Sequence, residues 1–411
     1  MSIPPPASEF PHGAVADLLA LVAEVKRRFV DKEEVIDVLA LALVARENAF
    51  LYGPPGTAKS ALVRALARGI TGGGGAFEYL LTRFTEPSEV FGPFDLRRLR
   101  EGELVTNTAG MLPEASVVFL DELFNANSAI LNALLVALNE RTFRRGQETR
   151  PLPALLFASA SNHLPDDEAL GALFDRFLVR VRCGPVAPEA LERVLEAGRA
   201  LAQDTPAAPA AGGSDDGAPP TVSFEALRAL QQACRRIAVA EVYEPYLRLV
   251  GDLRRLGVQL SDRRAVKAQN LLAASALLSG RDAANASDLW VLRYVWDAEE
   301  QIAPVRAAVD AAVAEALGGA ADDDDPYEDA VRALRPHPRA RRTAPDAEAL
   351  AAELARIREA YSAAEPRERA ALQDELRYLQ DRIPWLPPGA GRDRLAEDTD
   401  ALWTELLNVP A

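Results

Sequence analysis

The chain of 411 residues has only two cysteines, Cys183 and Cys234, and three histidines. The cysteines lie far apart, and neither has a CxxC partner or histidine neighbours, so we exclude a disulfide framework and a cysteine-based zinc site. The three histidines are too scattered for a metal cluster. We therefore expect no metal site built from these side chains, and the one divalent ion that we expect would enter together with a bound ligand.

The sequence also lacks long hydrophobic runs and an excess of positive charge. No apolar stretch approaches the roughly 18–20 residues that cross a bilayer, and residues 1–11 lack the basic-then-apolar order of a secretion signal. We therefore predict a cytoplasmic protein without a membrane span. The net charge is −15, from 61 acidic and 46 basic residues, and this balance disfavours nucleic acid as a partner.

Short apolar runs alternate with stretches of helical periodicity over the first half of the chain. This order predicts an α/β core in three layers around a five-stranded parallel sheet. The predicted strands are Asn48–Tyr52, Phe77–Thr82, Ser116–Leu120, Ala154–Ser161 and Phe177–Val181. Beyond the core, apolar positions recur at helical spacing, which predicts an all-α lid and a helical C-terminal extension.

Changes in composition suggest where the regions begin and end. Runs rich in proline and glycine, and one acidic run, separate the segments that show regular periodicity. The predicted regions are a disordered N-terminus at 1–14, the α/β core at 15–190, a flexible insert at 203–221, the helical lid at 222–317, an acidic linker at 318–345 and a helical C-terminal region at 346–411.

The strongest motif is GPPGTAKS, which lies between a predicted strand and a predicted helix. Such a loop aims backbone N–H groups at phosphates bound at a helix N-terminus. Lys59 would supply a cation for the β- and γ-phosphates, and the Ser60 hydroxyl would coordinate Mg²⁺. Ala58 replaces the glycine of the general pattern, and should fit if that position has helical backbone angles. The predicted phosphate-binding residues are Gly53, Pro54, Pro55, Gly56, Thr57, Ala58, Lys59 and Ser60.

Two carboxylates follow the apolar run Val117–Leu120 directly. A buried parallel strand ends at the carboxyl edge of the sheet, where α/β proteins bind their ligands. Asp121 would hold Mg²⁺ through water, and Glu122 would act as the general base toward the attacking water. Together with the glycine-rich loop, this pair predicts hydrolysis of ATP.

Asn162 follows the strand predicted at Ala154–Ser161. Its side chain could orient the attacking water or contact the γ-phosphate. Asparagine is also a common residue of turns at strand ends, so both interpretations stay open for this residue.

Arg176 precedes the last predicted strand. Because Lys59 already serves the site, a further arginine suggests a finger that reaches the γ-phosphate of a neighbouring subunit, and a planar guanidinium suits a phosphate oxygen. The alternative is an ion pair of Arg176 with Asp175. We place Arg180, within the strand, on the surface of the sheet.

The run LSDRR at 260–264 predicts the start of a lid helix, with Ser261 or Asp262 as its N-cap. Arginines in a first helical turn oppose the helix dipole unless an anion is near. Phosphate is such an anion, so Arg263 or Arg264 is a candidate phosphate contact. An exposed arginine pair is the alternative.

Together these motifs are similar to the MoxR group of AAA+ ATPases, and closest to its RavA branch. The resemblance covers about residues 15–310 and rests on GPPGTAKS, TRFTEPSEVFGPFDL, VVFLDELFNANSAILNALLVALNERTF, ASASN, LFDRF and LSDRRAVKAQNLLAASALLSGR. It implies that Gly53–Ser60 is Walker A, Asp121 with Glu122 is Walker B, Asn162 is sensor 1, Arg176 is the arginine finger and Arg263 is sensor 2. Whether Arg263 or Arg264 fills the last role stays open.

The resemblance also implies partners and a function. Members bind ATP and Mg²⁺, form homo-hexameric rings, work with a von Willebrand factor A (vWA) domain protein, and remodel or mature a client protein. The segment Glu101–Gly110 resembles the hairpin that this clade projects toward the pore, although it could be an ordinary surface hairpin. A nucleic-acid motor or restriction component, and a nucleotide-gated scaffold without turnover, are the alternative functions.

Overall fold

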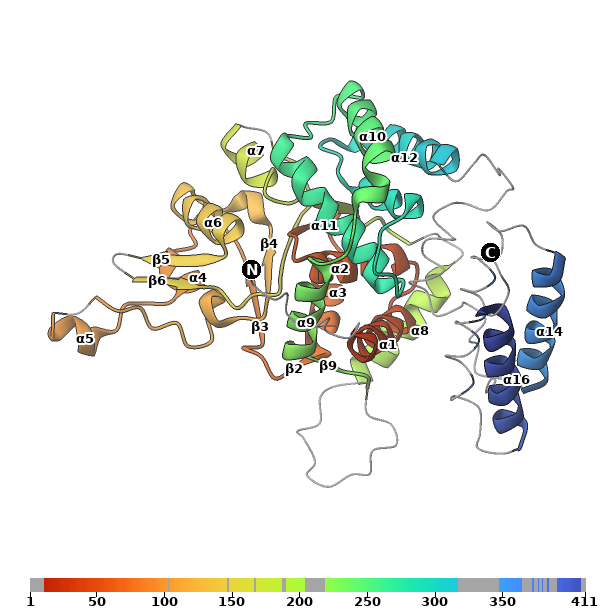
Figure 1. The fold of residues 1–411 in the computed structure, drawn as a ribbon. Coiled ribbons are helices and arrows are strands. Elements are labelled where there is room, and N and C mark those ends of the chain that lie inside the picture. Colours follow the sequence, from red (N-terminus) through yellow and green to blue (C-terminus); the bar gives the residue numbers. More distant parts are fainter. Residues whose placement is uncertain are drawn as a thin grey trace, which may run out of the picture. The chain divides into compact units, whose positions relative to one another are not determined.

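The computed structural model describes residues 11–102, 104–145, 148–165, 168–186, 190–203, 219–316, 347–363 and 390–407, with Leu372, Leu376, Leu379 and Ile383 as single residues. The chain divides into two compact units, 1–336 and 337–411 (Figure 1). The predicted acidic linker, most of the predicted insert and residues 1–10 lie outside the described residues. The first helix begins at His12, inside the segment predicted to be disordered.

The first unit is built on a parallel sheet of five strands in the order β3-β4-β7-β1-β8, as the sequence predicts. The observed bounds are β3 Ala76–Leu80, β4 Val117–Asp121, β7 Leu156–Ser161, β1 Ala49–Tyr52 and β8 Val179–Arg182. Each lies within two residues of its predicted position. Two smaller pairings were not predicted: a parallel pair of β2 (Ile70–Thr71) with β9 (Val222–Ser223), and an antiparallel hairpin of β5 (Thr142–Arg145) with β6 (Glu148–Pro151).

Both faces of the sheet are covered, because successive residues of each strand enter opposite hydrophobic clusters. In β4, Val117 and Phe119 belong to one cluster, whereas Val118 and Leu120 belong to the other. The first cluster includes α1 (His12–Arg28), α2 (Glu33–Ala45) and α3 (Lys59–Arg68). The second includes α4 (Pro87–Phe91), η1 (Leu112–Glu114), η2 (Leu123–Asn125), α6 (Ser128–Glu140) and α7 (Glu168–Phe174). This is the predicted three-layer arrangement.

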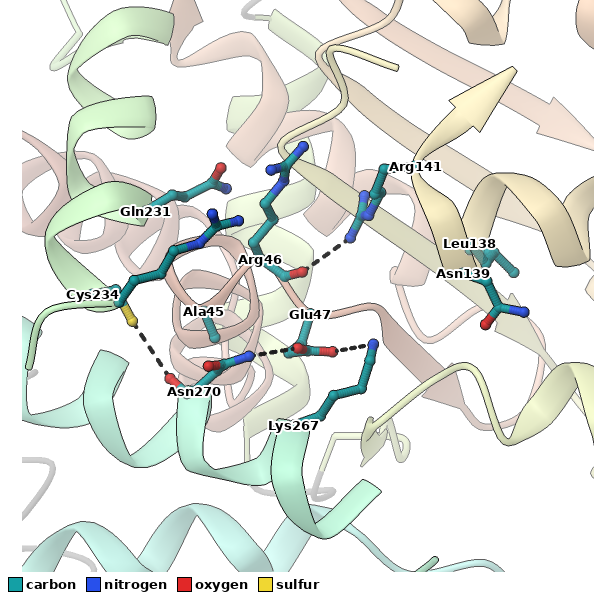
Figure 2. A pocket seen from close by; sticks show the side chains of 11 residues that line it. Ala45, Arg46, Glu47, Leu138, Asn139, Arg141, Gln231, Cys234, Lys267 and Asn270 are labelled. Atoms are coloured by element: carbon teal, nitrogen blue, oxygen red, sulfur yellow. Dashed lines mark hydrogen bonds and ion pairs between the residues drawn. The ribbon is translucent and has the colours of Figure 1, made fainter. Parts of the chain in front are cut away.

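The lid helices pack on the first face and share its hydrophobic cluster. They are α9 (Phe224–Cys234), η4 (Ala240–Val242), α10 (Tyr243–Arg255), α11 (Asp262–Leu278), η5 (Ala286–Tyr294) and α12 (Ile302–Ala316). The short η6 (Glu299–Gln301) precedes α12 and has no buried residue, and α8 (Leu191–Gln203) connects the core to the lid. A polar clasp also joins lid and core: Glu47, just before β1, accepts hydrogen bonds from Lys267 at 2.9 Å and Asn270 at 3.0 Å (Figure 2). The lid is therefore anchored beside the start of β1.

The segment predicted as a hairpin at Glu101–Gly110 belongs to a longer excursion from the core. An isolated antiparallel bridge joins Phe94 to Thr106, and α5 (Leu96–Arg100) forms within the loop that this bridge closes, with none of its residues buried. In Figure 1, α5 lies well away from the sheet. The prediction therefore located the excursion but missed the helical turn in it.

The second unit contains α14 (Ala347–Ala363) and α16 (Ala390–Leu407), which form a hydrophobic cluster of their own. Buried residues recur along α14 at helical spacing, as expected for an amphipathic helix. The cluster consists of Leu350, Leu354, Ile357, Tyr361, Leu376, Leu379, Ile383, Leu395 and Leu402. Among the described helices of both units, none is long and apolar enough to span a bilayer.

Candidate active site

The glycine-rich loop connects β1 to α3 at the carboxyl edge of the sheet. Its first residue, Gly53, donates a backbone hydrogen bond to the Ser161 carbonyl at 3.2 Å. A Cβ at Gly53 would come within 2.1 Å of the Cys183 carbonyl oxygen, so any side chain there would collide with backbone. Gly56 has a φ of +82°, in the left-handed region that glycine adopts without strain. The loop thus requires glycine at both positions.

The Lys59 side chain is buried and turned into this loop. Its ammonium donates to the carbonyls of Gly53 at 2.7 Å and Pro54 at 2.9 Å. In the part of the chain that the structure describes, no side chain caps the N-terminus of α3, so the first N–H groups of this helix are open to an external acceptor. A cation beside an uncapped helix N-terminus fits a phosphate group.

Ala58 does not have the helical backbone angles on which its predicted fit depended. Its φ of 65° and ψ of 18° lie in the left-handed region, where the Cβ of an L-residue approaches the following carbonyl oxygen and costs roughly 1–2 kcal/mol. The general pattern has glycine at this position, and the backbone angles explain why. Ala58 is accommodated as a strained residue just before α3.

Ser60 and Asp121 meet although they are 61 positions apart in the chain. The Ser60 hydroxyl lies 2.9 Å from a carboxylate oxygen of Asp121, because α3 begins beside the end of β4. A hydroxyl and a carboxylate are oxygen ligands of the type that Mg²⁺ prefers. The sequence predicted both residues for one metal site, and the structure brings them together.

Glu122 follows Asp121 in a left-handed conformation with a φ of 52°. Its backbone N–H donates to the Asp121 carboxylate at 3.1 Å. Its side-chain oxygen Oε2 is buried and has no hydrogen-bond partner among the described residues. A buried carboxylate oxygen left free in this way fits a group that must accept a proton from water.

Asn162 comes directly after β7, whose last residue pairs in register with Tyr52 at the end of β1. The asparagine is therefore next to the start of the loop. Its Oδ1 lies 2.7 Å from Nδ1 of His163, whose ring also lies 3.3 Å from the Ser161 hydroxyl. The sequence assigned no role to His163, but its contact with Asn162 makes it a candidate for positioning that side chain.

Arg176 lies at the opposite, amino-terminal edge of the sheet. Its carbonyl accepts a hydrogen bond at 2.7 Å from Asn48, which immediately precedes β1. The four residues of β1 separate Asn48 from the loop, a span of about 13 Å at 3.3 Å per residue. The side chain is partly exposed and pairs with Asp175 at 2.7 Å, so the ion pair considered as an alternative is present.

The prediction that Arg180 lies on the sheet surface is wrong, because this residue is fully buried beneath the lid. It donates to the carbonyls of Phe177 at 2.9 Å and Trp296 at 2.6 Å, and it pairs with Asp297. The guanidinium also stacks over the Phe174 ring, 3.7 Å from its centroid. The prediction failed because the partners of Arg180 in the lid follow it by more than a hundred residues.

Arg263 and Arg264 have different surroundings, which the sequence could not distinguish. Ser261 is the N-cap of α11 and accepts from the Arg264 N–H. The Arg264 side chain is buried and donates to Asp297 at 2.7 Å and to the Val295 carbonyl at 2.7 Å. Arg263 is exposed and donates to Asn139 of α6 at 2.6 Å. The exposed-pair alternative is therefore wrong for Arg264, and Arg263 is the arginine accessible to a ligand.

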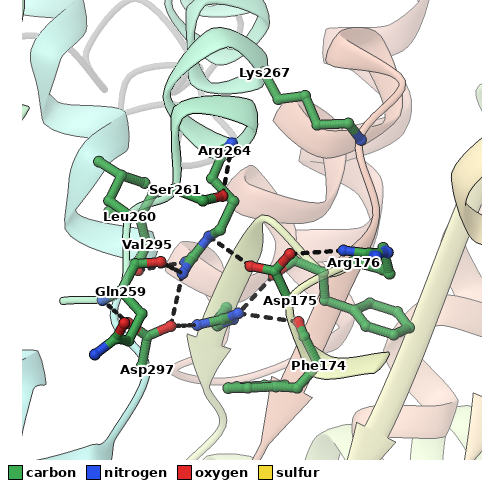
Figure 3. A network of polar contacts seen from close by, with 12 residues as sticks. Phe174, Asp175, Arg176, Gln259, Leu260, Ser261, Arg264, Lys267, Val295 and Asp297 are labelled. Atoms are coloured by element: carbon green, nitrogen blue, oxygen red, sulfur yellow. Dashed lines mark hydrogen bonds and ion pairs between the residues drawn. The ribbon is translucent and has the colours of Figure 1, made fainter. Parts of the chain in front are cut away.

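Asp297 joins these elements, and no sequence motif had indicated it. It lies between Arg180 of the core and Arg264 of the lid, while Asp175 lies between Arg264, at 4.0 Å, and Arg176 (Figure 3). Burial alone would raise the pKa of Asp297, but Arg180 and then Arg264 outweigh it and lower the pKa. The lid is thus connected through charged side chains to Arg176.

Comparisons with known proteins agree with this architecture. Residues 16–214 match a family model described as the MoxR domain in the MoxR-vWA-beta-propeller ternary systems, and residues 246–309 match an AAA lid domain. The chain is 32% identical over 275 residues to uncharacterized protein MJ0812 of Methanocaldococcus jannaschii, over 66% of this chain and 69% of that protein. It is 29% identical over 196 residues to chaperone MoxR1 of Mycobacterium tuberculosis, over 45% of this chain and 50% of MoxR1.

A solved structure from Cytophaga hutchinsonii, provisionally assigned as an ATPase, superposes with a TM-score of 0.57 at 17% identity. The superposition covers 74% of this chain and 96% of the C. hutchinsonii chain. At this identity the likeness shows the fold alone. The core and lid matches, together with the likeness to MoxR1, show that the chain belongs to the MoxR family of AAA+ ATPases.

Proposed function

We propose that the protein hydrolyses ATP in a homo-hexameric ring and couples hydrolysis to the remodelling or maturation of a client protein. The observation that carries the proposal is the meeting of Ser60 and Asp121 at 2.9 Å. Beside it lie the buried Lys59 ammonium and the Glu122 oxygen that has no hydrogen-bond partner among the described residues. These groups form the set that Mg²⁺-dependent phosphoryl transfer needs.

Each residue would have a separate task. Lys59 and the N–H groups of the loop would hold the phosphates, and Ser60 with Asp121 would hold the metal ion. Glu122 would accept the proton of the attacking water, which Asn162 would help to orient. Bound Mg²⁺·ATP would supply the phosphoryl group and the divalent charge.

The distribution of arginines supports assembly into a ring. Arg176 is anchored beside Asn48, at the other edge of the sheet from Lys59, so within one subunit it has no route to the loop. Arg263 contacts α6 at that same edge, where Asn139 lies near the C-terminus of the helix. A neighbouring subunit that brought its loop to this edge would receive both cations, Arg176 as the arginine finger and Arg263 as sensor 2.

The family also suggests partners. The matched family model is described by systems that combine MoxR with vWA and beta-propeller components, and MoxR1 is described as a chaperone. We infer a vWA-domain partner and a protein client for this chain, and we keep its placement in the RavA branch as part of the proposal. The net charge of −15 supports a protein client over nucleic acid.

Two substitutions at the loop edge test the hydrolase. Lys59→Ala should lose binding of a fluorescent ATP analogue, whereas Glu122→Gln should keep it and lose phosphate release, because only the base is removed. Arg248→Ala, at an exposed lid residue, is the matched control and should retain both. Equal affinity of wild type and Lys59→Ala would refute the loop assignment.

Ring assembly has its own test. Sedimentation velocity at micromolar concentration should show a shift from small species to a hexamer when ATP is added to Glu122→Gln, which would hold the nucleotide without turnover. A monomer both with and without ATP would contradict the ring, whatever the hydrolysis assay shows.

A further inference from the structure

A pocket of about 150 Å³ lies where the lid meets the amino-terminal edge of the sheet. It is separate from the glycine-rich loop, because Arg46 and Glu47 in its wall lie just before β1, whereas the loop follows the other end of β1. Figure 2 shows Arg46 and Arg141 side by side in it, with Glu47, Lys267 and Asn270 forming a second group. The charged side chains that line it are Arg46, Glu47, Arg141, Arg235 and Lys267.

The charges of this pocket do not balance. It has four cationic side chains and one carboxylate, although the whole chain is acidic. Glu47 is already engaged by Lys267 and Asn270. Within the described residues, Arg46, Arg141 and Arg235 form no ion pair with a carboxylate, so three guanidinium groups share a pocket without a counter-ion.

The two inner arginines also have unused donors. Arg141 donates from Nη2 to the Asn48 side chain at 2.8 Å and to the Arg46 carbonyl at 3.1 Å. Its Nη1, and Nε of Arg46, are buried and have no acceptor among the described residues. A buried donor without a partner is costly unless a ligand supplies the acceptor.

The pKa values of these arginines also reflect the missing negative charge, because the guanidinium groups repel one another. Burial, and after it the charge of Arg235, lowers the pKa of Arg46. Burial, and after it the charge of Arg46, lowers the pKa of Arg141. Both residues end a helix, α2 and α6, in the left-handed conformation. A favourable contact with the helix dipole would explain one cation at each helix end, but not the convergence of both on one pocket.

We propose that this pocket binds a phosphate-class oxyanion, as a second anion site distinct from the glycine-rich loop. Guanidinium groups recognise phosphate through paired N–H donors, and Arg46, Arg141 and Arg235 would surround a small tetrahedral anion. Such an anion comes from one of two sources, free inorganic phosphate or pyrophosphate, or a phosphate of the nucleotide held by a neighbouring copy of this chain.

Binding there would have a structural consequence. Arg46 and Arg141 belong to the core, whereas Arg235 and Lys267 belong to the lid region, so one anion would hold the two parts together. Asn48 contacts both the Arg141 guanidinium and the Arg176 carbonyl. Anion binding would therefore also fix the segment that carries Arg176.

The test begins with the full-length Lys59→Ala chain, in which the loop has lost its cation. Phosphate and pyrophosphate are titrated at constant ionic strength and followed by ³¹P NMR and thermal unfolding. For free phosphate as the source, we expect saturable binding and a raised melting temperature. Arg235→Gln, at an exposed position, and Arg46→Gln should each weaken binding about tenfold or more, and Arg248→Gln should leave it unchanged.

A second arm addresses the neighbour's nucleotide. If the anion comes from it, phosphate gives no saturable binding to Lys59→Ala, and Arg235→Gln instead weakens ATP-analogue affinity about tenfold in assembled rings but not in monomers. Because Arg235 is exposed, this variant should fold even if Arg46→Gln does not. The proposal is overturned if neither arm responds to Arg235→Gln, and this outcome is independent of whether Lys59→Ala abolishes hydrolysis.

Discussion

The two edges of the central sheet carry different chemistry. The carboxyl edge combines Lys59, Ser60, Asp121 and Glu122, a cation with metal-binding and proton-accepting oxygens inside one subunit. The amino-terminal edge gathers arginines, such as Arg176, which is linked to Arg264 of the lid through Asp175. In the function proposed above, one edge would hold the nucleotide and the other would supply charges that complement it. The difference fits the proposed ring, in which each subunit would offer half of two sites.

The largest effect is expected at Arg176. An arginine finger contributes roughly 10³–10⁵ to the rate of phosphoryl transfer, so Arg176→Ala should abolish turnover while ATP-analogue affinity stays nearly unchanged. Mixing the two variants tests whether Arg176 acts on a neighbouring subunit. Rings of Arg176→Ala alone and of Lys59→Ala alone should be inactive, but re-annealed mixtures should recover partial activity, because some sites then combine an intact loop with an intact Arg176. Mixed rings that are confirmed by native mass spectrometry and stay inactive would rule out action between subunits.

Removing the charge of Asp297 should produce the next largest effect. Asp297→Asn leaves Arg180 and Arg264 buried without their shared carboxylate, which costs about 3–5 kcal/mol of unfolding free energy. Urea unfolding measures this, with the exposed Asp252→Asn as the control. An unchanged midpoint for Asp297→Asn would show that the network contributes no stability.

Asp297 also predicts a pH dependence. Because the two arginines lower the pKa of the folded carboxyl, its contribution is present above the unfolded pKa of about 3.9. It is lost as the pH falls through the lower folded pKa. The acid side of the stability curve should therefore be flatter in Asp297→Asn than in the wild type.

The adjacent arginines 263 and 264 should respond differently to substitution. If Arg263 contacts phosphate as proposed, Arg263→Ala removes one charge-assisted contact worth about 1.5–3 kcal/mol, and it should lower turnover about 10- to 150-fold without changing the melting temperature. Arg264→Ala breaks buried contacts with Asp297 and should lower the melting temperature. Full turnover in Arg263→Ala would refute the assignment of Arg263 as sensor 2.

The smallest effect concerns the strained residue of the loop. Ala58→Gly relieves the left-handed strain at φ 65° but adds freedom to the unfolded chain, so a net stabilisation of up to about 1 kcal/mol is expected. Ala65→Gly, inside α3, is the matched control and should destabilise by roughly 0.5–1 kcal/mol. Equal destabilisation by both substitutions would contradict the strain.

The sequence alone was sufficient for the features that depend on neighbouring residues. Apolar runs identified the five strands within two residues of their observed bounds, and the strand–loop–helix around Lys59 was readable because glycines and a helix start are local signals. The positions of Asp121, Glu122 and Asn162 near one another could also be predicted from the sequence, since the carboxyl ends of parallel strands meet at one edge of a sheet.

Only the tertiary structure decided which arginines are buried and which are accessible. Arg180 and Arg264 both pair with Asp297, and Arg141 approaches Arg46 across 95 positions of the chain. No local pattern encodes such contacts, because they join residues that are far apart in the chain. Local periodicity therefore specified the sheet and its loop, whereas contacts between distant parts of the chain determined the environment of these arginines.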